Sequence, residues 1–506
     1  MSSKNRRDGM TRRQFLKKTG VGAGIMALGP VSVAKAAQWP KGIKTEKHGV
    51  VVVGAGFSAL SAAVEAKLNG ADVIVLEKTK MDVSGGNSRI CGGMICVPLE
   101  DSKQAKDNYY EDFMKKSMGN GDPVLTRLLA ENTQAGIDWL KGQGVEFFPP
   151  TGVVGYRAQA FVPTPGLYRG MVKVLEKLRE VLEKRGGKIV YETKAKELIM
   201  SSSGRVAGVK VIDQAGVKDY MADTVIIASG GFAANKEMLV QWIDPHADGM
   251  MVRGRPWITG DGLRMAEEVG AVLVSMGGMT ALHVAAVSPQ NTAAGNPFMA
   301  VPLYLGINQE GKRYVDESKG YVVNGKASMK QPGQKIALVF DEEVKNTGPG
   351  TTGYKLFEGL KIPVIEADTV EELASKIEVP PAALKATIDE FNSAVKDGKA
   401  LGANPPKEAN AKVMKPKFYA FYPMVPGITL TFGGIKVNSN AQVLEADGRI
   451  IPGLYAAGES VGGLFYDDYV GGGSLARCLV LGRIAGKNAA AEKITIKPKK
   501  ETPKKS

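Results

Sequence analysis

The sequence predicts an α/β fold, in which a domain built on a parallel sheet is interrupted by an inserted α+β capping domain. Three observations lead to this prediction. A strand, a Gly-rich turn and a helical stretch follow one another over residues 49–68, and a βαβ texture continues to about residue 245. Between about residues 278 and 422 prolines become more frequent and the expected strands shorter. We therefore place the parallel-sheet domain at residues 45–278 and 425–492 and the cap at residues 279–424.

The turn at residues 54–59 has the sequence of a dinucleotide-binding fingerprint, Gly-Ala-Gly-Phe-Ser-Ala. In a Rossmann-type unit, Gly54 makes the tight turn, Gly56 lets a pyrophosphate approach the backbone, and Ala59 allows the helix to pack closely on the strand. The N–H groups and the dipole at the start of the helix favour phosphates. This segment therefore predicts a nucleotide-binding site.

Two further features favour FAD over a nicotinamide cofactor. A second strand at residues 72–76 ends on Glu77, which can accept hydrogen bonds from an adenosine ribose, and Lys78 follows. A second Gly-rich loop spans residues 84–94. A flavin ring has to lie flat against backbone, which such a loop permits, whereas a nicotinamide enzyme does not require it. We therefore expect a Rossmann-type FAD-binding domain, with non-covalent FAD because no histidine stands in these loops.

Later Gly-containing turns are expected to meet the same cofactor. They follow a buried strand near residue 228, begin a helix near residue 261, and form a Gly-Glu turn at residues 458–459. The turn at residues 471–474 caps a last helix, whose N-terminus would face an electron-rich group such as the pyrimidine end of a flavin. The residues expected to bind FAD are Gly54, Ala55, Gly56, Ser58, Ala59, Glu77, Lys78, Gly85, Gly86, Asn87, Ser88, Gly92, Gly93, Met94, Ala195, Ser229, Gly230, Asp261, Gly458, Glu459, Ser474 and Leu475.

The N-terminus carries the pattern of a twin-arginine export signal. Arg12 and Arg13 precede a weakly apolar stretch at residues 21–33, and Ala34-Lys35-Ala36 offers an A-x-A cleavage site. The apolar stretch is shorter than the ~20 residues that a membrane span needs, so we expect no stable span. An ordinary basic, disordered N-terminus is the alternative. With a signal at residues 1–36, the protein is expected in the periplasm, exported by a route that carries folded proteins.

The formal net charge of +14 does not indicate a nucleic-acid partner. Much of the excess of Lys and Arg lies in residues 1–36 and in a basic tail at residues 493–506. A solvated end and an arm that docks an acidic redox partner are both compatible with such a tail.

Three cysteines, Cys91, Cys96 and Cys478, provide neither a disulfide framework nor the ligands of an iron–sulfur cluster. The chain has no Cys-x-x-Cys-His motif for covalent haem, and no metal site is expected. Cys91 and Cys96 are expected to be buried apolar side chains, with a redox pair as the alternative. Electrons have to reach the flavin from elsewhere, and for an exported protein we expect a separate c-type cytochrome as the donor.

Over about residues 48–492 the chain resembles the flavoprotein family of soluble fumarate reductases, succinate dehydrogenase flavoprotein subunits, urocanate reductase-like enzymes and 3-ketosteroid dehydrogenases. The motifs that carry the resemblance stand at residues 54–59, 77–78, 84–88, 229–232, 259–262, 311–314, 453–459 and 471–486. The resemblance implies a substrate between the flavin and the cap. It also implies hydride transfer between flavin N5 and one carbon of an activated double bond, with a side chain moving the proton at the neighbouring carbon.

Departures from the family pattern bear on the substrate. Asn324, Leu430 and Tyr469 stand where fumarate reductases have an Arg, a His and a second Arg. A dicarboxylate needs paired cationic donors, so fumarate itself is not the expected substrate. Tyr469 with the Gly-rich stretch after it resembles the ketosteroid dehydrogenases, which implies that the Tyr469 hydroxyl and the Gly473 N–H hold a carbonyl or carboxylate oxygen. A Tyr469 that only packs is the alternative.

The group that moves the proton stays open among His283, Tyr321 and Tyr304. His283 and Tyr321 both lie near positions that the family uses, and an imidazole or a phenol serves if it is within hydrogen-bond reach of the reacting carbon. Tyr304, Asn324 and Arg157 are expected to contact the substrate. For each of these residues a purely structural role is the alternative.

Together these features predict an FAD-dependent oxidoreductase that reduces, or in reverse forms, a C=C bond conjugated to a carbonyl or carboxylate. Its substrate would be a small unsaturated carboxylate or an enone, and its setting anaerobic respiration. Two alternatives stay open. One is a dehydrogenase of the 3-ketosteroid or tricarballylate type, and the other is a flavin-bearing electron-carrier subunit without substrate chemistry.

Overall fold

The computed structural model of this protein covers most of the chain between residues 44 and 492. The described residues are 44–147, 151–153, 156–161, 170–287, 294–297 and 299–492, with the backbone alone in 151–153 and 156–161. The expected export signal at residues 1–36 and the basic tail at residues 493–506 lie outside them. Within these ranges no helix is both long and apolar enough to cross a membrane, and no group of three or more His, Cys, Asp or Glu side chains could hold a metal ion.

The first sheet consists of eight strands, β1 (Lys44–Val53), β2 (Val73–Leu76), β6 (Lys188–Val190), β7 (Lys194–Met200), β8 (Val206–Asp213), β9 (Gly216–Ile227), β18 (Gln442–Leu444) and β19 (Ile450–Ala456). Their order is β18-β19-β9-β1-β2-β6, and β7 and β8 extend from β9 as antiparallel neighbours. β2 runs parallel to both β1 and β6, and β19 runs parallel to β9. β2 and the second half of β1 are buried and rich in Val, as strands of a covered parallel sheet are. The predicted α/β fold is confirmed.

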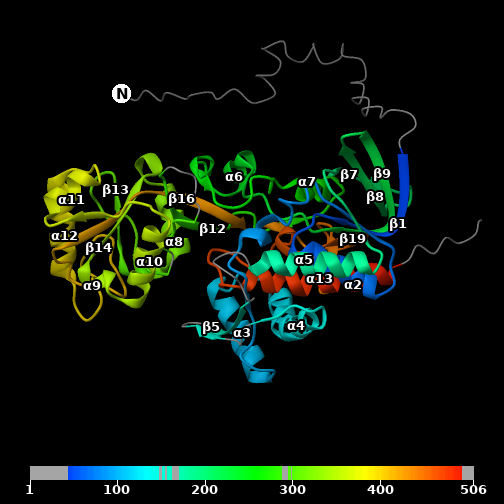
Figure 1. Cartoon of the computed structure of the whole chain (residues 1–506), viewed down its shortest axis with the longest axis horizontal. Helices are drawn as coiled ribbons and strands as arrows, with labels where there is room; N and C mark the ends of the chain where they lie inside the picture. Colours follow the sequence, from blue (N-terminus) through cyan, green and yellow to red (C-terminus); the bar gives the residue numbers. More distant parts are fainter. Residues whose placement is uncertain are drawn as a thin grey trace, which may run out of the picture. The chain divides into compact units, whose positions relative to one another are not determined.

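Three helices lie side by side along this sheet: α2 (Phe57–Leu68), α5 (Gly170–Lys184) and α13 (Gly473–Ala491) (Figure 1). α13 approaches α2 closely because two of its glycines face that helix. A Cβ atom on Gly482 would stand 2.6 Å from the carbonyl oxygen of Ser58, and one on Gly486 would stand 2.2 Å from that of Ala62. The C-terminal helix is thereby held against the helix of the N-terminal fingerprint.

Further elements surround these helices. α3 (Lys103–Lys116) packs on α4 (Pro123–Gly142), and α4 packs on α13. Side chains of Ser102 and Asp122 cap α3 and α4 by accepting hydrogen bonds from their first N–H groups. The remaining elements of this region are β3 (Met94–Cys96), β4 (Thr151–Val153), β5 (Tyr156–Phe161), α6 (Lys236–Trp242), α7 (Asp261–Glu268), β11 (Leu273–Val274) and β17 (Gly434–Ile435).

The second sheet consists of six strands, β10 (Met251–Val252), β12 (Met279–Ala285), β13 (Leu305–Asn308), β14 (Ile336–Asp341), β15 (Ile365–Ala367) and β16 (Phe418–Thr431). β16 pairs with β10, β12, β14 and β15. The domain boundary that we place at residues 424–425 falls inside this strand. The two parts of the chain therefore share a continuous backbone element there.

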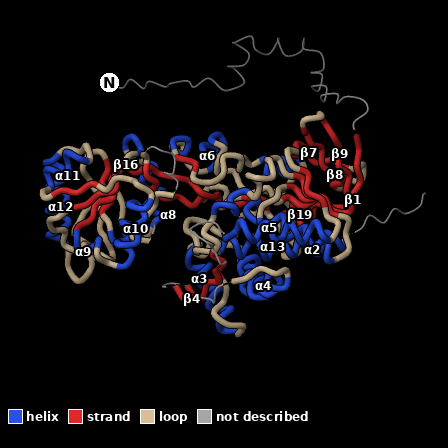
Figure 2. Tube along the Cα trace, viewed as in Figure 1, coloured by secondary structure: helices blue, strands red, loops and turns tan. Residues whose placement is uncertain are grey.

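Five helices accompany the second sheet: α8 (Tyr321–Met329), α9 (Glu342–Lys345), α10 (Gly348–Gly359), α11 (Val370–Lys376) and α12 (Pro381–Ala394) (Figure 2). Its strands contribute to two apolar cores. Leu373 and Leu384 of α11 and α12 belong to one core, and Phe357 of α10 belongs to the other.

A buried cluster of three charged side chains lies beside this sheet. The Glu317 carboxylate accepts hydrogen bonds from Arg313 Nε at 3.0 Å and Nη2 at 2.7 Å, and Lys407 Nζ lies 3.6 Å from it. The side chains of Arg313, Glu317 and Lys407 are 1%, 0% and 1% exposed. Lys407 Nζ also donates to the carbonyl oxygen of Tyr304 at 2.8 Å. Burial lowers the pKa of Lys407, and the Glu317 charge opposes this effect.

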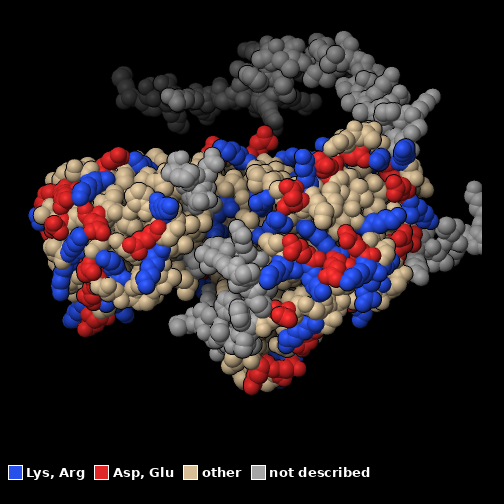
Figure 3. Space-filling model, viewed as in Figure 1, with Lys and Arg blue, Asp and Glu red and all other residues tan. Residues whose placement is uncertain are grey.

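Charges of both signs are interspersed over the face of the molecule drawn in Figure 3. Among the described residues, Lys103 pairs with Asp107 and Lys385 with Asp389, each pair one helical turn apart. A face of this kind lacks the basic stripe that nucleic-acid recognition uses.

Candidate functional site

Two adjoining cavities form the candidate site. The fingerprint turn, the end of β2 and the turn before α7 line the first cavity. The second has a volume of about 220 Å³ and is lined from β12, from β16 and from the start of α13. Asn87, Ser88, Glu459 and Cys478 line both cavities. A single ligand can therefore extend from one cavity into the other.

The fingerprint turn presents backbone to the first cavity. Gly54 has a φ of 103°, a conformation that favours glycine, and a Cβ there would lie 2.6 Å from the carbonyl oxygen of Ala228. α2 begins after Gly56, which offers no side-chain cap. The Phe57 N–H donates to Ser88 Oγ at 3.2 Å, and the next N–H groups of the helix are left for phosphates.

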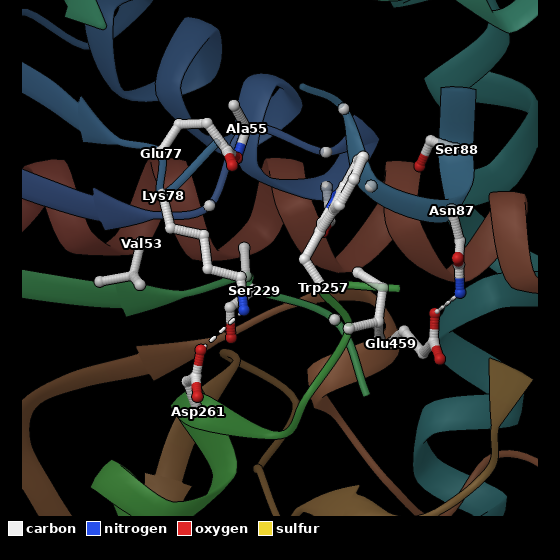
Figure 4. A pocket seen from close by; sticks show the side chains of 18 of the residues that line it. Val53, Ala55, Glu77, Lys78, Asn87, Ser88, Ser229, Trp257, Asp261 and Glu459 are labelled. Carbon is white, nitrogen blue, oxygen red and sulfur yellow. Dashed lines mark hydrogen bonds and ion pairs between the residues drawn. The ribbon is translucent and has the colours of Figure 1, made fainter. Parts of the chain in front are cut away.

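Glu77 holds its carboxylate at the first cavity (Figure 4). The residue is 6% exposed. One oxygen accepts the Ala55 N–H at 2.9 Å, and the other accepts the N–H and the hydroxyl of Thr79 at 2.8 and 2.7 Å. A carboxylate oxygen has more than one acceptor site, so this fixed group can still accept from ribose hydroxyls.

Lys78 and Asp261 form an ion pair at the same cavity (Figure 4). Lys78 Nζ donates to Asp261 Oδ2 at 2.7 Å, and Lys194 Nζ lies 3.3 Å from Oδ1. Burial acts to raise the pKa of Asp261, but the two lysines outweigh it and the pKa is lowered. Asp261 is therefore held as a carboxylate at the start of α7.

Two buried polar atoms of the first cavity have no hydrogen-bond partner among the described residues. They are Ser229 Oγ and Trp257 Nε1. The Trp257 ring lies among the lining side chains in Figure 4, with the Arg255 guanidinium 4.2 Å from its centroid. Buried polar groups without partners are costly, so both atoms fit a polar ligand. Together with Gly54 and Glu77 they fit the adenosine and pyrophosphate of FAD.

The second cavity combines a cation and hydroxyl groups with apolar walls. Its polar side chains include Arg253, Thr280, Asn296, Tyr321, Thr429 and Tyr469, and its apolar ones Ile90, Met94, Leu282, Leu430 and Leu475. Arg253 Nη1 donates to Thr429 Oγ1 at 3.2 Å. Arg253 is the one Lys or Arg among the described residues that line this cavity. The arrangement can bind one anionic or carbonyl group beside an apolar body.

Asn87 and Glu459 connect the two cavities. Asn87 Nδ2 donates to Glu459 Oε2 at 3.2 Å and to the carbonyl oxygen of Thr429 at 3.0 Å. The Thr431 N–H donates to Glu459 Oε1 at 3.2 Å. Burial raises the pKa of Glu459, and the charge of Arg477 acts against this. These bonds fix the Gly-Glu turn where the cavities meet.

The cysteines are free thiols, and Cys91 and Cys478 line the second cavity. Burial raises the pKa of Cys91 and of Cys96 to about 12 and that of Cys478 to about 11. All three are therefore protonated near neutral pH and are poor nucleophiles.

Most of the predicted FAD-binding residues line the cavities. Those at the first are Gly54, Ala55, Gly56, Ser58, Glu77, Lys78, Gly85, Gly86, Asn87, Ser88, Ala195, Ser229, Gly230, Asp261 and Glu459. Those at the second include Gly92, Gly93, Met94, Ser474 and Leu475. Ala59 and Gly458 line neither cavity. Ala59 is fully buried in α2, and Gly458 approaches α2 so closely that a Cβ would stand 2.2 Å from Ser58 Oγ.

Of the predicted catalytic residues, the structure brings Tyr321 and Tyr469 to the second cavity. Gly473 does not line it, and its N–H donates to the carbonyl oxygen of Val470 at 2.9 Å. We therefore correct the expectation that the Gly473 N–H donates to a substrate, because this N–H already donates to a carbonyl oxygen within the turn.

The expected substrate contacts also change. Tyr304 is fully buried, with its ring 4.8 Å from that of Phe340, and Asn324 Nδ2 donates to the carbonyl oxygen of Gly320 at 2.8 Å. Neither Tyr304 nor Asn324 lines the cavity, because both side chains are enclosed by neighbouring elements. Arg157 lies in β5, and its side chain is outside the described part of the chain.

His283 is likewise away from the second cavity. On β12 the side chains of Thr280 and Leu282 line the cavity, whereas that of His283 does not, as alternation along a strand requires. Its Nε2 instead hydrogen-bonds with the Tyr314 hydroxyl at 3.1 Å. Burial lowers the pKa of His283 to about 4. The imidazole is therefore neutral at pH 7 and is not placed to deliver a proton.

His283 is expected to make the protein sensitive to acid. Its folded pKa of about 4 lies below the ordinary value of 6.5, so the unfolded chain binds the proton first as the pH falls. The contribution of His283 to the free energy of unfolding is complete above pH 6.5. As the pH falls from 6.5 to 4, about 3 kcal/mol of this contribution is lost. A His283→Gln variant should show a flatter dependence of unfolding free energy on pH in this window. Parallel pH profiles of the two proteins in urea unfolding would contradict this.

The residues at the site that escaped prediction from the sequence include Arg253, Trp257 and Thr429. The first two lie in the segment between β10 and α7, next to the predicted turn at residues 259–262. Their nearness to that turn was the available signal. Thr429 lies on β16, whose pairing with distant strands brings it to the cavity.

Comparisons with known proteins agree with this geometry. The chain matches the family model described as FAD binding domain over residues 49–475. It is 31% identical to a fumarate reductase (cytochrome) of Shewanella frigidimarina in an alignment of 456 residues that covers 87% of this chain and 76% of that protein. It is 30% identical to the NADH:acrylate oxidoreductase of Vibrio harveyi over 90% of this chain, but spans only 52% of that protein, about half its length. The open conformation of a flavocytochrome c3 fumarate reductase matches with a TM-score of 0.72 and 28% identity, over 97% of this chain and 83% of the other.

Proposed function

Because the chain belongs to the FAD binding domain family, together with FAD-dependent fumarate reductases, we propose that it reduces a C=C bond conjugated to a carbonyl or a carboxylate. The protein is an FAD-dependent oxidoreductase. The observation that carries the proposal is the second cavity, which adjoins the FAD cavity and whose described lining includes one cation and two phenols. A substrate bound there lies next to the cofactor.

FAD supplies the hydride when it is bound. Arg253 binds the carboxylate or carbonyl oxygen of the substrate through charge-assisted hydrogen bonds. The Tyr469 hydroxyl donates to the same group, which draws electron density away from the double bond. Tyr321 delivers the proton to the carbon next to that group. Leu282 and Leu430 keep water away from the reacting carbons.

A monocarboxylate or an enone suits this cavity better than fumarate. Two carboxylates need two sets of cationic donors, and among the described lining residues only Arg253 is cationic. Leu282, Leu430 and Leu475 offer carbon atoms instead, so a second carboxylate would find no second cation among the described lining residues. The substrate class that fits is an acrylate-type monocarboxylate with an apolar substituent.

The compartment of the protein and its electron donor are two further parts of the proposal. The twin-arginine pattern at residues 12–13 and the cleavage site at residues 34–36 support export to the periplasm. A separate c-type cytochrome as electron donor is supported by the similarity to a fumarate reductase (cytochrome) and to a flavocytochrome c3 fumarate reductase.

The reaction can be tested without knowledge of the natural donor. Purified protein is loaded with FAD, reduced with dithionite without oxygen, and mixed with candidate acceptors while the flavin absorbance is followed. Fast reoxidation by cinnamate-type acids or enones, with fumarate inert, is the expected result. Fast reoxidation by fumarate would contradict the substrate class. Inertness toward the whole panel, with reduction of oxidised flavin by a saturated ketosteroid, would favour the dehydrogenase alternative.

Arg253 is expected to decide between acids and ketones. In Arg253→Met the kcat/KM for a cinnamate-type acid should fall about 100-fold, because a charge-assisted hydrogen bond of about 1.5–3 kcal/mol is lost. The value for an enone should change by less than about tenfold. Steady-state assays with reduced methyl viologen measure both. Arg264→Met is the matched control, because Arg264 is 49% exposed and lines neither cavity. Equal losses for both substrates in Arg253→Met would refute the role.

A further inference from the structure

A fully buried cation lies behind the second cavity. Arg477, in the second turn of α13, is 0% exposed, and no carboxylate among the described residues forms an ion pair with it. Its Nη1 donates to the carbonyl oxygen of Val461 at 3.0 Å and its Nη2 to Ser474 Oγ at 3.1 Å. Its Nε has no partner within the described ranges. A buried charge without a carboxylate partner disfavours folding, and a role in binding an anionic group would offset that cost.

The bond from Arg477 leaves the Ser474 hydroxyl proton available. A serine hydroxyl has one donor and two acceptor sites, and Arg477 occupies an acceptor site. Ser474 lines the second cavity, so its O–H can donate to a group bound there. The N–H groups of Ser474 and Leu475 belong to the first turn of α13, where no acceptor exists within the helix.

These groups give one edge of the second cavity a positive potential. Gly472 caps α13 without a side chain, and the first turn of the helix has no acidic residue. The helix dipole adds to the charge of Arg477. Glu459 is the carboxyl group whose charge acts on Arg477. Burial raises the pKa of Glu459, which disfavours its charged form and so weakens Glu459 as a counter-charge for Arg477.

Reduction adds negative charge to the pyrimidine end of a flavin ring. Gly54 and Glu77 fit the pyrophosphate and adenosine, so the ring is the part of FAD that reaches toward the second cavity. We propose that Arg477 is a positioning residue that, through the hydroxyl of Ser474, stabilises this charge and raises the reduction potential of the bound FAD. It favours the reduced over the oxidised cofactor because only the reduced ring carries the added charge.

The midpoint potential of the bound FAD tests this inference directly. It is measured by anaerobic equilibration of the full-length, FAD-loaded protein with a reference dye, without any substrate. In Ser474→Ala and in Arg477→Met we expect binding of reduced relative to oxidised FAD to weaken at least tenfold, which lowers the potential by about 30 mV for this two-electron couple. In the double variant the effect should equal that of Ser474→Ala alone, because Arg477 acts through the Ser474 hydroxyl.

Ser61→Ala is the matched control for Ser474→Ala. Ser61 is a fully buried hydroxyl on α2 that has no partner among the described residues and lines neither cavity. Its loss should leave the potential unchanged. If Arg477→Met fails to fold or to retain FAD, Ser474→Ala alone decides the question.

Two results would overturn the inference. One is an unchanged potential in Ser474→Ala with FAD still bound at one per chain. The other is an unchanged potential with weaker binding of a cinnamate-type acid, which would assign the hydroxyl to the substrate. Because the measurement needs no substrate, it stands or falls separately from the proposed reaction.

Discussion

Replacement of Glu317 by alanine is expected to lower the free energy of unfolding by about 3–5 kcal/mol, because it leaves two buried cations without their counter-charge. Arg313 and Lys407 are each 1% exposed, so water cannot take over the role of the carboxylate. The variant also strands the Gly306 N–H, which donates to Glu317 Oε1 at 2.9 Å. Urea unfolding followed by circular dichroism gives the magnitude.

Glu310→Ala is the control for this prediction. Glu310 lies 3.6 Å from Lys312, and both side chains are more than half exposed. A surface ion pair of this kind contributes about 1 kcal/mol or less. Similar losses of unfolding free energy in Glu310→Ala and Glu317→Ala would show that Glu317 does not stabilise the buried cluster more than a surface carboxylate stabilises its ion pair.

Replacement of Gly54 by alanine is expected to weaken the binding of FAD to the protein. An L-residue at a φ of 103° is strained, and the new Cβ would stand 2.6 Å from the carbonyl oxygen of Ala228 and 3.0 Å from Ser229 Cα. Strain and overpacking together cost about 3 kcal/mol, and the ends of β1 and β9 have to separate where the pyrophosphate binds. We expect a loss of at least about tenfold in FAD affinity, measured by flavin fluorescence during titration of the apoprotein.

Gly70→Ala is the control that separates the effect of backbone strain from the effect of a steric clash of the new Cβ. Gly70 has a φ of 81°, but nothing lies within 4 Å of a Cβ at that position. This variant should lose some stability and retain FAD. Retention of FAD by Gly54→Ala as well would mean that the fingerprint turn can adjust to a side chain.

The FAD cavity could largely be predicted from the sequence because its parts are local. A strand, a turn and a helix that follow one another fix the geometry of Gly54 and Glu77 without reference to distant residues. The same holds for the Gly-Glu turn at residues 458–459. In these segments spacing along the chain translates directly into position at the cavity.

The second cavity could be predicted only in part, because pairing of distant strands creates it. β12 meets β16, and the register of that pairing decides that Thr280 and Leu282 line the cavity while His283 does not. A shift of one residue would exchange the two faces. Arg253 reaches the site from a segment without a motif, and Arg477 could have been noticed only from its position one turn after Ser474.

The contact between α2 and α13 has a consequence for biogenesis. Glu459 and Cys478 line the same cavity as Gly54, although the ribosome synthesises them more than four hundred residues later. While the nascent chain still lacks α13, the glycines that hold that helix against α2 are missing, and so is Cys478 from the lining of the first cavity. We therefore expect stable FAD binding only after the segment through α13 has been synthesised.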